Sequence, residues 1–210
     1  MTSTIDSRSS DPAPRPGAVL GIDSDDKRPL WLLDFDGVLN AISKRGMNTG
    51  WHTWNTASVK SPLPGEDNVH YPLLWASETV QAVADAHDAG VRVVWLTTWR
   101  EHTALLPPLM NGLPPDLEFW DEDTVLAAGG KLDPMLQLNQ QWKYDTARQL
   151  VPDGVPVLWT DDNLPYILRK GAQWASSRPG GTTRIVPTQT LGLSKNQTFE
   201  VNEWVRDAVR

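Results

Sequence analysis

Three short apolar runs, each ending in polar side chains, constrain the fold of this chain more than any other feature of its sequence. They read PLWLLDF at 29–35, VRVVWLT at 91–97 and VPVLWT at 155–160. A continuous apolar run of about four to eight residues is typical of a strand that is buried on both faces, as strands of parallel sheets are. The sequence therefore predicts a mostly parallel sheet that contains these strands.

Helical signals lie between the apolar runs. Residues 77–90 carry apolar side chains at helical spacing, with Ser77 expected as the N-cap and Gly90 as the stop. The other expected helices lie around 101–111, at 134–151, at 164–170 and at about 197–209, and the other expected strands at 116–120, 172–175 and 183–187. Strands that alternate with helices predict an α/β fold, with helices on both faces of the sheet.

The length of the chain, 210 residues, suits one well-packed α/β domain and is short for two. Residues 1–28 are rich in Ser, Asp and Pro, show no periodicity and are expected to form a disordered tail. Residues 29–210 are expected to form the domain. Within it, the glycines and prolines of a small insert at about 38–76 favour loops or a small hairpin.

The composition excludes several classes of protein. Without cysteine the chain has neither a disulfide scaffold nor a thiolate zinc site. No apolar run approaches the roughly 18 residues of a membrane span, and the N-terminus lacks the apolar stretch of a signal peptide. We therefore expect a cytoplasmic protein with no membrane partner. The net charge of −7 argues against a general attraction to nucleic acid.

The segment LDFDGVLN, at 33–40, carries the strongest chemical signal. Asp34 and Asp36 leave a strand two residues apart, so they point in similar directions, and Gly37 permits a sharp turn after them. One carboxylate can attack phosphorus and form an aspartyl phosphate. The other can protonate the leaving oxygen and later activate a water molecule. The alternative interpretation is a strand-end turn with two solvated acids.

A second acidic pair follows the third apolar run, in VLWTDDN at 157–163. Asp161 and Asp162 can supply oxygen ligands to Mg²⁺, the hard cation that a dianionic phosphate needs beside two carboxylates. Alternatively, Asp162 or Asn163 caps the next helix. In open parallel sheets the ligand site lies beyond the carboxyl ends of the strands. We therefore expect both acidic pairs to lie at one site.

Hydroxyl and basic side chains complete the candidate site. Thr97 or Thr98, at the end of the second apolar run, can bind a phosphate oxygen, and Arg100 is either a second phosphate ligand or a helix-surface residue. Lys143 can neutralise the aspartates and the phosphate. Lys131 competes for this role, but the helix and strand that follow Lys143 would carry it to the site.

The motifs LDFDGVLN, WLTT, Lys143 and WTDDN, in this order, resemble the haloacid dehalogenase superfamily of phosphatases over roughly residues 29–187. WLTTWR and WTDDN are most similar to the domain of this type in Swiss-Army-Knife-type RNA repair proteins. The resemblance implies a Rossmann-like three-layer fold with a mostly parallel sheet. It also implies a nucleophile, Asp34; an acid/base, Asp36; phosphate ligands, Thr97 and Lys143; and Mg²⁺ held by Asp34, the Asp36 carbonyl, and Asp161 or Asp162.

The insert bears on the substrate. Members of the superfamily usually cover the site with a cap, but this insert is too short for a full cap domain, which predicts an open site or one that another subunit covers. Four side chains of the insert are expected to contact the substrate: Lys44, Arg45, Trp51 and Trp54. Tryptophan stacking and basic contacts suit a phosphorylated nucleotide or nucleic-acid end. The alternative is a small satellite core under a loop, with His52 structural or solvated.

The sequence thus predicts Mg²⁺-dependent phosphoester hydrolysis through an aspartyl phosphate on Asp34. Two alternatives stay open. A phosphotransferase of the same fold would pass the phosphoryl group to an acceptor other than water, and a binding module of the same fold would retain the residues without turnover.

Overall fold

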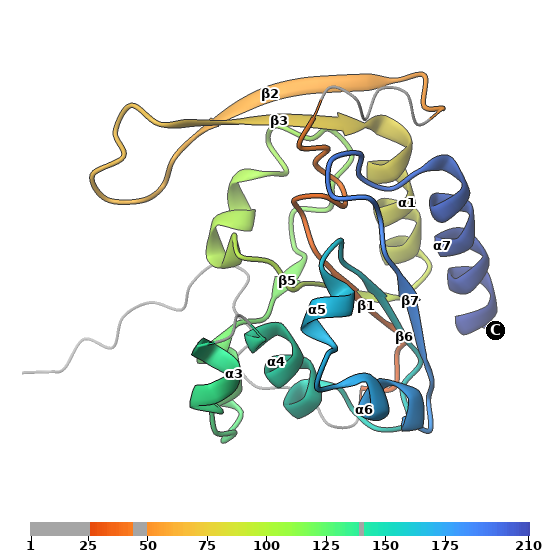
Figure 1. Ribbon diagram of the computed structural model, residues 1–210. Coiled ribbons are helices and arrows are strands. Elements are labelled where there is room, and N and C mark those ends of the chain that lie inside the picture. The colour runs from red at the N-terminus through yellow and green to blue at the C-terminus, as the bar shows by residue number, and fades with distance from the viewer. Residues whose placement is uncertain (1–25, 44–49, 139–140) are drawn as a thin grey trace, which may run out of the picture.

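The computed structural model describes residues 26–43, 50–138 and 141–210. Its centre is a five-stranded sheet in which every pair of neighbours is parallel. The strands follow one another across the sheet as β5 (Glu118–Phe119), β4 (Arg92–Trp95), β1 (Leu30–Leu33), β6 (Val157–Thr160) and β7 (Thr182–Ile185) (Figure 1). The α/β fold with a parallel sheet, predicted from the apolar runs, is confirmed, and the arrangement is Rossmann-like.

Helices cover both faces of this sheet. One face packs on α1 (Ser77–Asp88) and α7 (Lys195–Ala208). The other packs on α2 (Glu122–Ala127), α4 (Trp142–Leu150), α5 (Leu164–Ile167) and α6 (Ala172–Ser177), and α3 (Pro134–Leu138) lies against α4. Successive side chains of a strand point to opposite faces, so Trp31 joins the first core and Leu32 the second.

The register of the sheet brings three strand ends level with one another. Leu33, the last residue of β1, lies opposite Trp95 of β4 and Thr160 of β6. The Asp34 amide continues the ladder by donating to the Thr160 carbonyl at 3.1 Å. The residues that follow β1, β4 and β6 therefore emerge at one edge of the sheet.

The insert forms an antiparallel hairpin of β2 (Trp54–Lys60) and β3 (His70–Ala76), which runs across the top of the molecule in Figure 1. The Ala41 amide donates to the Leu74 carbonyl at 2.7 Å, and the Leu74 amide donates to the Asn40 side chain at 2.8 Å. These bonds tie the hairpin to the loop that follows the first acidic pair. The predicted small hairpin is confirmed.

Several local predictions are wrong or only partly confirmed. Ser77 is not the N-cap of α1: Ala76 holds that position, and the Ser77 hydroxyl accepts from Asn55 instead. The helical character expected around 101–111 is confirmed in part, as a 3-10 helix, η2 (Arg100–Leu105), which ends before Pro107 because proline lacks the donor to continue it. The strand expected at 172–175 is part of α6, where Ala175 joins the second core.

Other predictions fall partly outside the described residues. The helix expected at 134–151 is divided into α3 and α4, which flank 139–140. Of the expected N-terminal tail, only residues 26–28 are described. Lys44 and Arg45 also lie outside the described residues. Among the helices that the structure describes, none is both long and apolar enough to cross a bilayer.

Candidate active site

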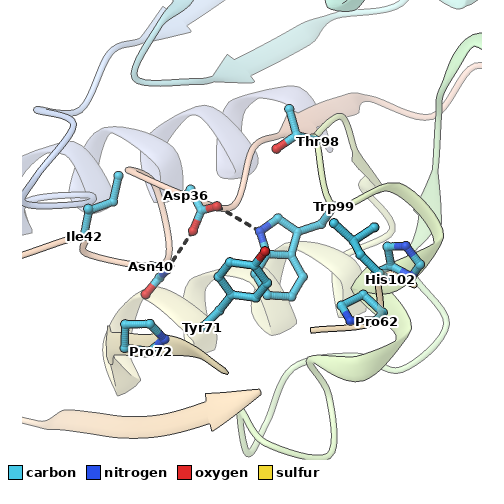
Figure 2. A pocket seen from close by; sticks show the side chains of 10 residues that line it. Asp36, Asn40, Ile42, Pro62, Tyr71, Pro72, Thr98, Trp99 and His102 are labelled. Atoms are coloured by element: carbon cyan, nitrogen blue, oxygen red, sulfur yellow. Dashed lines mark hydrogen bonds between the residues drawn. The ribbon is translucent and has the colours of Figure 1, made fainter. Parts of the chain in front are cut away.

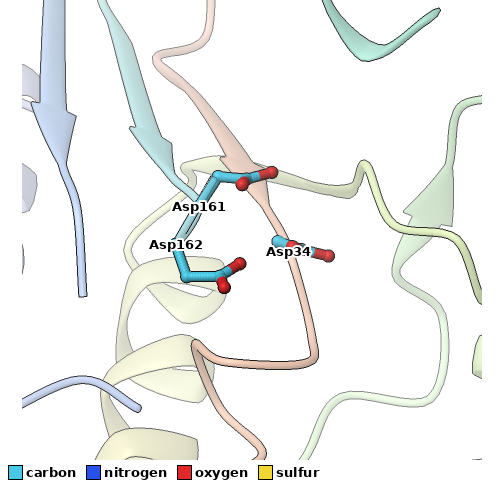
Figure 3. A group of neighbouring side chains, drawn as sticks. All are labelled: Asp34, Asp161 and Asp162. Carbon is cyan, nitrogen blue, oxygen red and sulfur yellow. The ribbon is translucent and has the colours of Figure 1, made fainter. Parts of the chain in front are cut away.

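Three carboxylates meet at the edge of the sheet where β1 and β6 end. Asp34 follows β1, and Asp161 and Asp162 follow β6, its neighbour (Figure 3). One oxygen from each of the three side chains lies within 4.8 Å of the others. Asp161 has no exposed surface and Asp34 is 6% exposed, while Asp162 is partly exposed. The cluster is therefore a largely buried concentration of negative charge.

Lys143 is the cation of this cluster. It is the second residue of α4, is 6% exposed, and places Nζ 2.9 Å from Asp34 Oδ2 and 2.7 Å from Asp161 Oδ2. Lys131, the competing lysine, is exposed, and its backbone bonds the Gln149 side chain. The structure thus brings Lys143, rather than Lys131, to the two acidic motifs.

One lysine does not balance three carboxylates. Burial and then the charge of Asp34 raise the pKa of Asp161 to about 7, although Lys143 opposes the shift. The same two causes raise the pKa of Asp162. Burial would lower the pKa of Lys143, but the charges of Asp34 and Asp161 outweigh it and raise that pKa. The cluster favours additional positive charge.

The donor set of the cluster fits Mg²⁺. This cation takes oxygen ligands and is commonly bound through one or two carboxylates together with water. Asp34, Asp161 and Asp162 present carboxylate oxygens close enough to share one ion. The Asp36 side chain is not in this group, and ligation through the Asp36 carbonyl stays a prediction. The Asp161 carboxylate also accepts from the backbone amide of Asn163 at 2.8 Å. Neither Asp162 nor Asn163 caps α5 through its side chain.

Asp36 is held apart from the acidic cluster by two donors. Asn40 Nδ2 donates to Asp36 Oδ1 at 2.7 Å, and Trp99 Nε1 donates to Asp36 Oδ2 at 2.8 Å (Figure 2). Both oxygens of the carboxylate are therefore bonded, which fixes its orientation. Neither Asn40 nor Trp99 was identified from the sequence as a functional residue, although each belongs to a motif quoted above, as the last residue of LDFDGVLN and within WLTTWR.

Gly37 allows the chain to turn directly against Asp162. Its φ is +75°, a conformation that side chains other than glycine rarely adopt. A Cβ at this position would lie 2.7 Å from Asp162 Cγ. The turn predicted from Gly37 is thus required both by the backbone and by the close approach of the metal-ligand candidate.

The hydroxyl and guanidinium candidates have different surroundings. Thr97 is buried just beyond β4, whereas Thr98 is exposed and lines a pocket beside Asp36. Either can still be the phosphate ligand. Arg100 pairs with Glu122 at 2.8 Å, and its guanidinium lies 5.4 Å from the ring centre of Trp142. These contacts are on the α2 and α4 side of the molecule.

The pocket beside Asp36 has a volume of about 410 Å³. Asp36, Asn40 and Trp99 line it, as do Leu63 and Tyr71 of the hairpin region. Figure 2 shows the Asp36 carboxylate with its two bonds among the side chains of this pocket. The sequence did not identify Tyr71 or Leu63, because their place depends on how the hairpin folds back over the loop.

The tryptophans expected to contact substrate are not among the residues that line this pocket. Trp51 Nε1 donates to the Leu193 carbonyl at 2.8 Å. Trp54 pairs with Ala76 at the end of the hairpin opposite its turn. His52 is exposed. Burial raises the pKa of the Glu78 carboxyl, but a hydrogen bond from Thr53 and weaker interactions, the charge of His52 among them, lower that pKa overall.

No family model, no curated protein and no solved structure matches the chain.

Proposed function

We propose that this protein is a Mg²⁺-dependent phosphoester hydrolase of the haloacid dehalogenase type, with Asp34 as its nucleophile. One observation carries the proposal. Asp34 bonds Lys143 and shares a carboxylate cluster with the acidic pair that follows β6, while Asp36, two residues on, is fixed by two donors and lines a pocket.

The first step would be attack by an Asp34 carboxylate oxygen on the phosphorus of a phosphate monoester. A bond forms between that oxygen and phosphorus, and the bond from phosphorus to the leaving oxygen breaks. Asp36, in its protonated form, gives its proton to the leaving oxygen, which departs as an alcohol. Because Asp36 lines the pocket, the leaving group would occupy it.

In the second step, a water molecule would attack the phosphorus of the aspartyl phosphate. Asp36, now a carboxylate, takes the proton of that water, and the bond between phosphorus and Asp34 breaks. Inorganic phosphate is released, and both aspartates return to their starting states. The hydrogen bonds from Asn40 and Trp99 hold the Asp36 carboxylate in one orientation during both proton transfers.

Lys143 would neutralise negative charge throughout the reaction. Its Nζ already bonds Asp34 and Asp161, so it can stabilise the charge on the transferred phosphoryl oxygens without moving far. Asp34, Asp161 and Asp162 would hold the Mg²⁺, which supplies further charge neutralisation and orients the phosphoryl group.

Release of inorganic phosphate from a panel of phosphate monoesters tests this proposal. The wild-type protein with Mg²⁺ should turn over at least one of them, and both chelation and Asp34→Asn should abolish turnover. Asp153→Asn, which changes an exposed acid of a surface loop in the same way, should have no effect. A rate that Asp34→Asn or chelation leaves unchanged would contradict the proposal.

A further inference from the structure

The walls of the pocket are held in place before any substrate binds. The rings of Tyr71 and Trp99 meet edge to face at 6.0 Å, and Trp99 also packs edge to face on Phe35 at 5.1 Å. The Tyr71 hydroxyl donates to Glu66 at 2.9 Å, and the Ser61 hydroxyl donates to the same carboxylate oxygen at 2.5 Å. These bonds connect the hairpin to its own loop and fix the aromatic wall.

The charges around the pocket are mainly negative. Asp36 lines it, and Glu66 accepts from the hydroxyl of Tyr71, another lining residue. The hydroxyls of Ser61 and Tyr71 lower the pKa of Glu66, which keeps this side chain ionised at neutral pH. The described residues that line the pocket include the imidazole of His102 and no lysine or arginine. A second phosphate group would therefore meet Asp36 and Glu66 with no permanently charged cation among these residues to pair with.

Apolar side chains form much of the rest of the lining, together with Thr98 and His102. Leu63 is 47% exposed and Ile42 is 54% exposed, and Pro62 and Pro72 also line the pocket. When a ligand covers apolar side chains of a concave surface, their burial lowers the free energy of the complex and so favours binding. The volume of about 410 Å³ is within the range of small-molecule sites.

From these contacts we infer that the pocket binds an uncharged leaving group with a flat ring, so that the substrate is an aryl or nucleoside monophosphate. This inference rests on the proposed function. It places a single phosphate at Asp34 and Lys143, and an uncharged ring against Tyr71 and Trp99. It disfavours the end of a nucleic-acid strand, whose following phosphates would lie beside Asp36 and Glu66.

Substrate preference tests the inference directly. Phenyl phosphate and a nucleoside 5′-monophosphate should exceed glucose 6-phosphate and a 5′-phosphorylated oligonucleotide in kcat/KM by about tenfold or more, the size of a hydrophobic-pocket preference. Equal or higher kcat/KM for the sugar phosphate or the oligonucleotide would overturn the inference, while the hydrolase itself would stand.

A pair of matched variants tests whether the preference for a substrate with a ring arises in this pocket. Leu63→Ser should reduce kcat/KM for phenyl phosphate roughly threefold to tenfold more than for glucose 6-phosphate, because it removes apolar contact from the pocket. Leu126→Ser makes the same change at a leucine that is 52% exposed on α2 and outside the pocket, and it should alter neither value. Identical behaviour of the two variants would overturn the inference.

Equilibrium binding separates this inference from the proposed function. Phenylphosphonate, which cannot be hydrolysed as an ester, should bind the Mg²⁺-loaded protein more tightly than methylphosphonate, and Leu63→Ser should reduce the difference. This result would support the pocket even if no ester were turned over. Equal affinity for the two phosphonates would show that the pocket does not recognise the ring.

Discussion

The acidic cluster and the aromatic pocket meet at the turn formed by Asp36 and Gly37, yet they are built in opposite ways. Asp36 lines the pocket, while Gly37 lies against Asp162 of the cluster. The cluster consists of charged side chains buried at the ends of two central strands. The pocket is lined by aromatic and apolar side chains, several of them exposed, together with polar ones such as Asp36 and His102. Most of them come from the hairpin region and the segment after β4.

The two parts of the site are therefore constrained by different elements of the fold. The cluster is set by the ladder of the parallel sheet, so a change there disturbs both charge balance and folding. The pocket is set by a hairpin that packs over the domain and is tied to it at Asn40 and Ala41. Substitutions of the apolar side chains of the pocket, such as Leu63, should therefore change which ester is accepted and leave the chemistry in place.

The largest effect is expected from removing the cation of the cluster. Lys143→Met leaves buried carboxylates without their partner, so the unfolding free energy should fall by roughly 3 kcal/mol. Turnover should fall at least about a thousandfold, because the phosphoryl charge loses a preorganised cation. Chemical denaturation and phosphate release measure the two effects.

Lys170→Met is the control for this variant. Lys170 is exposed, so the substitution makes the same chemical change at the surface. We expect it to alter the unfolding free energy by less than about 0.5 kcal/mol. If Lys143→Met were as stable and as active as this control, the cluster would not depend on its lysine.

A smaller effect is expected at the boundary between cluster and pocket. Trp99→Phe keeps an aromatic wall but removes the donor to Asp36 Oδ2. We expect kcat to fall roughly tenfold with KM changed less than about twofold, because the variant loses the bond that positions the acid/base and keeps an aromatic ring against the substrate.

Trp204→Phe, at a partly buried tryptophan of α7, provides the matched control. It should leave kcat unchanged. A rise in KM without a change in kcat for Trp99→Phe would instead assign Trp99 to the pocket alone.

The smallest effect is expected at Trp51, in the segment that leads into the hairpin. Trp51→Phe removes the hydrogen bond to the Leu193 carbonyl, and the unfolding free energy should fall by about 1 kcal/mol. KM for a nucleoside monophosphate should change less than about twofold, because Trp51 does not line the pocket. A large rise in KM would support the sequence-based expectation that Trp51 stacks on the substrate.

The sequence predicted the cluster better than the pocket for a physical reason. Asp34 and Asp161 follow apolar runs directly, and parallel neighbours end at the same edge of a sheet, so their convergence follows from short local patterns. Lys143 was also predictable, because a single helix and strand separate it from Asp161.

The pocket depends on contacts between distant segments. Tyr71 and Trp99 meet only because the hairpin folds over the loop after β4, and neither spacing nor composition indicates this contact. The donors to Asp36 were missed for a related reason. The bond from Asn40 depends on the turn at Gly37, and the bond from Trp99 depends on the path of the chain beyond Thr97. Residues 172–175 show the same limit, because helix and strand are hard to distinguish in a short apolar segment.

The central claim is that Asp34 carries the phosphoryl group during turnover, and trapping that intermediate tests it most directly. Borohydride reduces an acyl phosphate, so protein quenched with borohydride during turnover of phenyl phosphate should contain homoserine in place of Asp34, as read by peptide mass spectrometry. Protein without substrate, and Asp34→Asn with substrate, should contain none. Homoserine at another aspartate, or rapid turnover with no reduced residue at position 34, would contradict the account.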